Sequence, residues 1–141
     1  MAQPQSTDTG VWYLCGMAHE WTAYSEPYGG YGRVKRFRGL YALTKVISEW
    51  QIEGFDYLEV GARYDANYQG PQSFQGFSGG GLWQLLIVQD HASGPRIVDR
   101  ILSGVAFYQS ALEGEIRRLT CHGRRSIYGP TIDIIREISV S

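Results

Sequence analysis

The sequence predicts an all-β fold, a mostly antiparallel six-stranded β-barrel followed by a C-terminal helix. Three observations support this fold class. Six segments rich in β-branched and aromatic residues recur along the chain. Clusters of Gly, Pro, Asn, Asp and Ser separate these segments, and one helical pattern closes the chain. The expected strands cover residues 11–16, 33–48, 55–60, 82–88, 102–108 and 116–122.

The first half of the chain contains three of these strands. Residues 1–10 lack apolar periodicity, so we expect a flexible lead-in followed by one domain over residues 11–141. The turn cluster at residues 26–32 separates the first strand from the long β pattern of residues 33–48. Gly39, in the middle of that pattern, predicts a bulge or a bend.

The second half has weaker boundaries. Residues 64–75 form a polar loop, and residues 90–100 have the composition of a surface connection. Residues 111–119 would also fit a helix, but Gly114 interrupts that pattern, so we favour a strand over residues 116–122. Residues 131–140 predict a helix, in which three isoleucines form a buried stripe. These are Ile134, Ile135 and Ile138.

Composition and charge exclude several classes of function. A net charge of −1 gives no basic excess for a nucleic-acid or membrane-surface partner, and the chain has no 18-residue apolar run. The cationic residues between 33 and 38 alternate with apolar ones, as on the wet face of a strand. There is no phosphate-binding loop and no histidine spacing for a metal, so we expect no cofactor and no metal.

Cysteine usage and the N-terminus bear on the compartment. Cys15 and Cys121 lie in expected strands without a neighbouring cysteine, so we expect two free thiols. The first ten residues are polar and do not resemble a signal peptide. These two observations predict a cytoplasmic protein.

The most informative stretch is residues 72–83, where Ser78 lies among glycines ahead of a strong β run. Gly76 and Gly79 permit positive φ and remove the Cβ atoms that would keep a substrate away. The N–H groups of Gly76 and Ser78 would then point at one spot and form an oxyanion hole for an acyl-transfer intermediate. Ser78 is the candidate nucleophile.

The string Gly-Phe-Ser-Gly-Gly at residues 76–80 fits two families. An α/β-hydrolase elbow needs a strand before the serine and a helix after it, and here the order is loop and then strand. This order resembles the nucleophile region of trypsin-like serine proteases. Residues 102–108 and the closing residues 127–140 are similar to the later parts of the second barrel of that family, and residues 11–16 to its opening strand.

The resemblance implies a nucleophile-bearing half of a serine endopeptidase that acts on a peptide or protein substrate. Gln72 and Ser73 would lie at the primary specificity pocket, and Phe107, Tyr108 and Gln109 would pair with substrate backbone. The first barrel, with the catalytic histidine and aspartate, is expected to come from elsewhere, and the isolated chain to be inactive. Phe77 replaces the aspartate that forms an activating ion pair in digestive members, which implies an oxyanion loop held by packing.

Two alternatives remain open. A small esterase would use an internal triad, which can be written as Ser78, Asp99 and His122, whereas His19 and His91 are more simply interpreted as surface residues. A non-catalytic barrel would bind peptides or a protein partner. A barrel that packs on another barrel should also expose an apolar face. Its candidate residues are Trp12, Trp21, Tyr24 and Tyr28.

Overall fold

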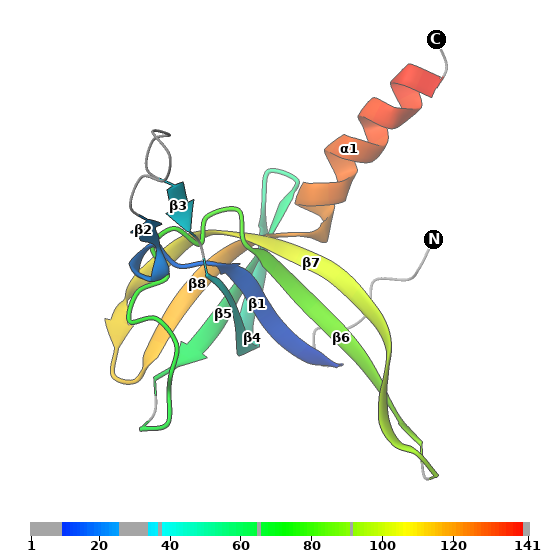
Figure 1. Ribbon diagram of the computed structural model, residues 1–141. Helices are drawn as coiled ribbons and strands as arrows, with labels where there is room; N and C mark the ends of the chain where they lie inside the picture. The colour runs from blue at the N-terminus through cyan, green and yellow to red at the C-terminus, as the bar shows by residue number, and fades with distance from the viewer. Residues whose placement is uncertain (1–9, 26–33, 37, 65, 91, 140–141) are drawn as a thin grey trace.

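The computed structural model describes residues 10–25, 34–36, 38–64, 66–90 and 92–139 (Figure 1). Six strands close into a barrel in the order β1-β4-β5-β8-β7-β6, and every pair of neighbours is antiparallel. The predicted fold class is therefore confirmed. The strands are β1 (Val11–Met17), β4 (Gly39–Ile52), β5 (Phe55–Arg63), β6 (Gly81–Asp90), β7 (Gly94–Glu113) and β8 (Ile116–Gly123).

The barrel consists of two three-stranded meanders, β1-β4-β5 and β6-β7-β8. They join along two seams, where β1 pairs with β6 and β5 pairs with β8. The connection from one meander to the other is residues 64–80, which contain no regular secondary structure where described and carry Ser78. The candidate site thus lies at one end of the barrel, beside the start of β6.

The core is built from the inward residues of both meanders. Leu14, Val60, Leu82 and Leu119 are at most 1% exposed, as expected for alternate residues of strands that enclose a barrel. Trp12 belongs to the same core at 6% exposure, so its assignment to an exposed apolar face was wrong. Its position in β1 points it inward, where its large apolar ring is removed from water.

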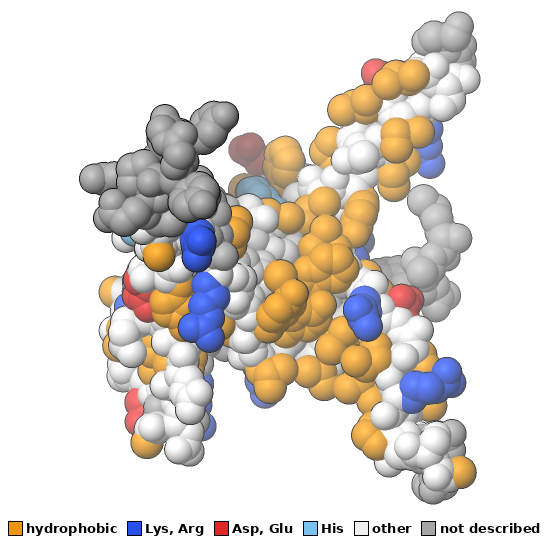
Figure 2. All heavy atoms as spheres, viewed as in Figure 1, with side chains coloured by type: hydrophobic (Ala, Val, Ile, Leu, Met, Phe, Trp, Pro, Cys, Tyr) orange, Lys and Arg blue, Asp and Glu red, His pale blue; other side chains and the backbone are white. Residues whose placement is uncertain are grey.

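An exposed apolar surface does exist, but other side chains form it. Tyr41 and Leu43 of β4 are 73% and 76% exposed, and with Tyr13, Leu85 and Ile97 they border an open hollow of about 300 Å³. Figure 2 shows hydrophobic side chains gathered on the outer surface of the barrel. Of the predicted aromatics, Tyr24 is exposed, Trp21 is half-buried, and Tyr28 lies outside the described residues.

The long β pattern of residues 33–48 divides into two strands. β3 (Val34–Arg36) pairs with β2 (Ala23–Ser25) as a separate two-stranded sheet, and β4 begins only at Gly39. Gly39 therefore starts a strand rather than bending one. The irregularity in β4 falls instead between Val46 and Ser48, where the register with β5 shifts. The predicted lead-in of residues 1–10 lies, apart from Gly10, outside the described residues.

The connection between β6 and β7 is shorter than the composition of residues 90–100 suggested. β7 begins at Gly94, and β6 and β7 pair out to Asp90 and Gly94 as a long hairpin. The strand expected over residues 116–122 is confirmed as β8, so the helical alternative for residues 111–119 was wrong. Its pairing with both β5 and β7 completes the barrel, and Gly114 takes positive φ in the preceding turn.

The C-terminal helix α1 (Arg124–Ser139) starts earlier than predicted and projects away from the barrel (Figure 1). Asp56 of β5 explains the early start, because its carboxylate accepts the N–H groups of Arg125 at 3.1 Å and Ser126 at 2.7 Å. The isoleucine stripe was predicted to be buried, and this was wrong. Exposure of Ile134, Ile135 and Ile138 is 56%, 56% and 71%.

Both cysteines are free thiols in strands, as predicted. Cys121 is fully buried, and burial raises the pKa of its thiol to about 12, so the group stays protonated and unreactive. Among the residues that the structure describes, no helix is both long and apolar enough to cross a membrane.

Candidate active site

Ser78 is presented to solvent by a tight turn whose aromatic residue is buried. Gly76 and Gly79 have φ of +91° and +87°, a backbone region that side chains with a Cβ rarely adopt. Between them, Phe77 points into the core at 2% exposure and packs edge-on against Phe74, with ring centroids 5.0 Å apart. The turn is thus anchored from inside while the Ser78 side chain remains exposed.

Two hydrogen bonds tie this turn to β7. The N–H of Gly79 donates to the carbonyl of Ala106 at 2.8 Å, and the N–H of Ala106 donates to the carbonyl of Gly80 at 2.8 Å. They extend the β6–β7 pairing, which otherwise ends at Gly81 and Val105. The serine turn and the residues after Ala106 in β7 are therefore held in one fixed arrangement.

The backbone N–H groups of residues 72–80 divide into two sets. Those of residues 72–75, 77, 79 and 80 each donate to an acceptor at 2.7–3.2 Å. Those of Gly76 and Ser78 have no acceptor among the described residues. Gly76 and Ser78 are exposed, so these two N–H groups, on either side of Phe77, are open to solvent or to a ligand.

Side chains from distant elements satisfy the loop before the serine. The Glu20 carboxylate, in the short 3₁₀ helix η1 (His19–Trp21), accepts the N–H groups of Gln72 at 2.7 Å and Ser73 at 3.2 Å. Gln109 of β7 accepts the N–H of Phe74 through Oε1 at 2.8 Å. It also donates from Nε2 to Ser73 Oγ at 3.1 Å. These contacts fix the path of the chain into the turn.

Two phenols hold the carbonyl side of the same loop. Tyr68 Oη donates to the carbonyl of Pro71 at 3.0 Å, and Tyr64 Oη donates to that of Gln72 at 3.3 Å. Burial raises the pKa of both phenols above the ordinary tyrosine value, so they stay protonated donors across the physiological range. The loop was predicted to be held by packing. In the structure, both the packing of Phe74 against Phe77 and these hydrogen bonds hold the loop.

A pocket of about 310 Å³ opens beside the turn. Its lining brings together five of the seven residues that the sequence nominated, and all five come from the turn or from β7. These are Gly76, Ser78, Phe107, Tyr108 and Gln109. No charged side chain of the described residues lines it, and apolar or aromatic groups make up much of its wall, including Phe74, Phe77 and Leu119. Such a pocket suits an uncharged group.

The other two nominated residues lie outside the pocket lining. Gln72 is exposed, and its N–H is bound by Glu20. Ser73 contacts the pocket only indirectly, because its hydroxyl accepts hydrogen bonds from Gln109 Nε2 and from the N–H of Gln75 at 3.1 Å. The side chain of Gln109, rather than Gln72, therefore borders the pocket on this side.

None of the described histidines lines the pocket. His122 instead packs between Phe107 and Tyr57, with ring centroids at 4.5 and 5.1 Å, and its Nδ1 has no hydrogen-bond partner among the described residues. Asp99 pairs with Leu86 in the β6–β7 hairpin and also lies outside the lining. His91 is outside the described part of the chain.

His19 is exposed, as predicted, and it lies beside the turn. Its N–H donates to the carbonyl of Gln75 at 2.7 Å, and a Cβ on Gly76 would lie 3.0 Å from its nitrogen. Glu20, its neighbour, was not singled out at all. The only sequence signal for either residue is the adjacent His-Glu pair directly after an expected strand, which says nothing about a loop more than fifty residues away.

Comparison with known proteins finds no matching family model, no matching curated protein and no matching solved structure. Within the described residues, no cluster of three or more His, Cys, Asp or Glu side chains is arranged to hold a metal ion.

Proposed function

We propose that Ser78 is the nucleophile of an acyl-transfer site, in the nucleophile-bearing barrel of a trypsin-like serine endopeptidase. The single observation that carries this proposal is the pair of free N–H groups on Gly76 and Ser78, in a loop where every other N–H from residue 72 to residue 80 has an acceptor. Two backbone donors beside an exposed serine hydroxyl are the parts of an oxyanion hole.

The proposed reaction follows from this arrangement. Ser78 Oγ forms a bond to the carbonyl carbon of the scissile amide, and the electron pair of the carbonyl moves onto its oxygen. The N–H groups of Gly76 and Ser78 stabilise that oxyanion. Collapse of the intermediate breaks the bond to nitrogen and leaves an acyl-enzyme on Ser78, which water then hydrolyses. A base must take the Ser78 proton and deliver it to the leaving nitrogen.

The β7 edge provides a place for substrate backbone. β6 pairs with β7 only as far as Val105, so residues 107–109 of β7 have no strand partner on that side among the described residues. An extended peptide pairing there would lie along the pocket that contains Ser78. Because no charged side chain lines the pocket, we propose a substrate with an uncharged side chain next to the scissile carbonyl.

The general base is proposed to come from outside the described residues, as a histidine oriented by an aspartate on another barrel. No described histidine lines the Ser78 pocket, which is the observation that favours this over an internal base. Without its base, serine is a weak nucleophile, so this chain alone should react slowly.

Chemical rescue tests the proposal without knowledge of the partner barrel. The 141-residue chain is treated with a fluorophosphonate probe, with and without added imidazole, which replaces the missing base. We expect imidazole to accelerate labelling at Ser78 and Ser78→Ala to abolish it, whereas Ser110→Ala, a serine of β7 outside the pocket lining, serves as the matched control. Imidazole-dependent labelling that persists in Ser78→Ala would contradict the proposal.

A self-contained esterase is the second candidate. Its internal base would be His19, whose backbone N–H binds the carbonyl of Gln75, since His122 packs against Phe107. In that case the chain labels rapidly without imidazole and His19→Ala removes the labelling. If the chain does not label under any condition but still binds uncharged peptides at β7, the non-catalytic binding barrel is the better description.

A further inference from the structure

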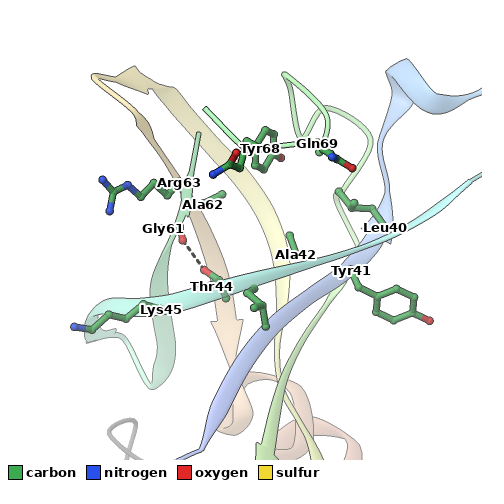
Figure 3. Close-up of a pocket in the computed structure, with 13 residues that line it drawn as sticks. Leu40, Tyr41, Ala42, Thr44, Lys45, Gly61, Ala62, Arg63, Tyr68 and Gln69 are labelled. Atoms are coloured by element: carbon green, nitrogen blue, oxygen red, sulfur yellow. Dashed lines mark hydrogen bonds between the residues drawn. The ribbon is translucent and has the colours of Figure 1, made fainter. Parts of the chain in front are cut away.

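A second hollow lies where β4 and β5 separate. The two strands pair from the hairpin end, at Ile52 and Phe55, as far as Lys45 and Gly61. Beyond that pair β4 continues back to Gly39 and β5 continues to Arg63, but the strands no longer pair with each other. Residues 67–70 border the resulting space, which has a volume of about 710 Å³ (Figure 3).

The separation leaves two strand edges facing the hollow. Residues 39–44 of β4 pair with β1 on their other side, and residues 62–63 of β5 pair with β8. Toward the hollow, their backbone groups have no hydrogen-bond partner from a strand among the described residues. A row of unpaired N–H and C=O groups is a template for an additional strand.

A side-chain hydrogen bond lies at the point where the two strands separate. Thr44 Oγ1 donates to the carbonyl of Gly61 at 2.8 Å, across the point of separation (Figure 3). This hydroxyl takes an acceptor that a backbone N–H would otherwise use. The hollow is therefore a built feature of the barrel, with a defined closed end at Thr44 and Gly61.

The described charged side chains of the hollow are cationic. Lys45 and Arg63 line it, and no acidic side chain of the described residues does. In Figure 3 both side chains extend from the closed end of the hollow, away from Leu40, Ala42 and Tyr68, so the charge lies at its outer rim. Arg63 has one acidic neighbour outside the lining, Glu115 at 3.6 Å, but both side chains are more than half exposed, so that pair is weak. An occupant with acidic groups would be complementary to this end.

The alternation of β4 indicates where the side chains of an added strand would lie. Leu40 is buried and Ala42 half-buried, so they face the inside of the barrel, whereas Tyr41, Leu43 and Lys45 are exposed on the outside. Residues directly across from each other in an added strand share these faces. Apolar side chains would face Leu40 and Ala42, and acidic ones would lie beside Lys45.

We propose that this hollow is a second binding site, which takes an extended peptide segment of alternating apolar and acidic residues as an added β-strand. It is distinct from the Ser78 pocket, because the two linings share no residue. Binding there does not depend on the chemistry of Ser78.

Fluorescence anisotropy tests the site with a labelled, acetylated and amidated hexapeptide of alternating valine and glutamate. We expect saturable binding that weakens about tenfold in Lys45→Glu, because attraction is replaced by repulsion at an exposed site. Arg96→Glu, a charge reversal on the exposed β6–β7 hairpin, is the matched control and should leave the affinity unchanged. Ser78→Ala should also bind normally. Circular dichroism and urea unfolding establish that each variant is folded.

Two further measurements examine the mode of binding. N-methylation of alternate backbone nitrogens of the hexapeptide removes donors needed for strand pairing, so one of the two N-methyl series should lose binding. Bound peptide should also slow hydrogen exchange at the amides of residues 40–43. The proposal is overturned if neither N-methyl series binds more weakly, if a valine-lysine hexapeptide binds equally well, if protection appears elsewhere, or if the glutamate peptide does not bind.

Discussion

Oε1 of Glu20 lies 2.7 Å from the backbone nitrogen of Gln72, so a carboxylate on η1 holds the loop that leads to the candidate nucleophile. Its second oxygen accepts the N–H of Ser73 at 3.2 Å. Phe77, next to Ser78, is buried, and an acid from η1 reaches the loop before it.

Removing the Glu20 acceptor should loosen that loop. Glu20→Ala leaves two N–H groups without their acceptor, which should cost about 1 kcal/mol, since the carboxylate is exposed and each bond is partly screened. We expect faster hydrogen exchange at Gln72 and Ser73 and slower imidazole-rescued labelling of Ser78. Glu115→Ala, which removes an exposed carboxylate paired only with Arg63, is the control. Equal exchange in both variants would show that Glu20 does not hold the loop.

Gly76 and Gly79 form a matched pair for testing the turn. Alanine at Gly79 meets nothing within 4 Å, so its cost is the positive φ alone, about 1–2 kcal/mol. Alanine at Gly76 carries the same φ penalty and also brings a Cβ to 3.0 Å from the His19 nitrogen and 3.1 Å from the Met17 carbonyl. Urea unfolding should therefore show the larger loss in Gly76→Ala.

If Gly79→Ala is instead the more destabilised variant, His19 and Met17 do not approach Gly76 closely. Labelling at Ser78 should also fall further in Gly76→Ala, because the displaced N–H belongs to the proposed oxyanion hole.

Asp56 should make the start of α1 sensitive to acid. Burial acts to raise the pKa of its carboxyl, but hydrogen bonds from Ser126 and Arg125 outweigh burial and hold that pKa below the ordinary value of 3.8. A carboxyl whose pKa is lower in the folded state than in the unfolded state stabilises the fold at pH values above the unfolded-state pKa. This stabilisation is lost as the pH falls through the folded-state pKa of Asp56. Asp56→Asn should lower the free energy of unfolding by about 1 kcal/mol at pH 7. Below about pH 4 that free energy should also depend less steeply on pH than in the unmodified chain.

Urea unfolding as a function of pH checks this expectation. Asp133→Asn is the matched control, because Asp133 is exposed and its ion-pair partner among the described residues is Arg136, at 3.7 Å on the same helix. If the free energy of unfolding depends on pH in the same way in Asp56→Asn and Asp133→Asn, Asp56 does not cap α1. Helix content measured by circular dichroism should fall in Asp56→Asn, since the helix N-terminus loses its acceptor.

Gln109 should influence the choice of substrate. It borders the Ser78 pocket, where no charged residue is present, and its Oε1 accepts the N–H of Phe74. Gln109→Glu keeps an acceptor for Phe74 and adds a negative charge to the pocket. Peptidyl phosphonates with a basic side chain should then label Ser78 faster, relative to uncharged ones, than in the unmodified chain. If the ratio of labelling rates by basic and uncharged phosphonates does not change in Gln109→Glu, the substrate side chain does not lie next to Gln109.

Local pattern was enough to predict the strands whose β signal is continuous. Residues 55–60 and 82–88 combine β-branched and aromatic residues with turn residues on both sides, and each became a strand of the barrel. The serine turn was also predictable, because Gly76 and Gly79 take the positive φ that only glycine adopts readily. Both signals depend on neighbouring residues alone.

Features that depend on distant partners were not predictable. The pattern of residues 33–48 looks like one strand, but β3 pairs with β2 and β4 with β1, a choice that the pattern does not encode. α1 begins at Arg124 because Asp56, in another strand, caps it. The contacts of Glu20 and His19 with the serine loop also join residues that are far apart in the sequence, so local pattern does not predict them.

NMR can follow the amide protons of Gly76 and Ser78 before and after a phosphonate is attached to Ser78, which tests the proposed oxyanion hole. A phosphonyl oxygen in the oxyanion hole accepts hydrogen bonds from these two groups, so their proton resonances should move downfield. The amides of Phe77, Gly79 and Gly80, which already have acceptors, should move little. Unchanged Gly76 and Ser78 resonances in a protein fully modified at Ser78 would contradict the account.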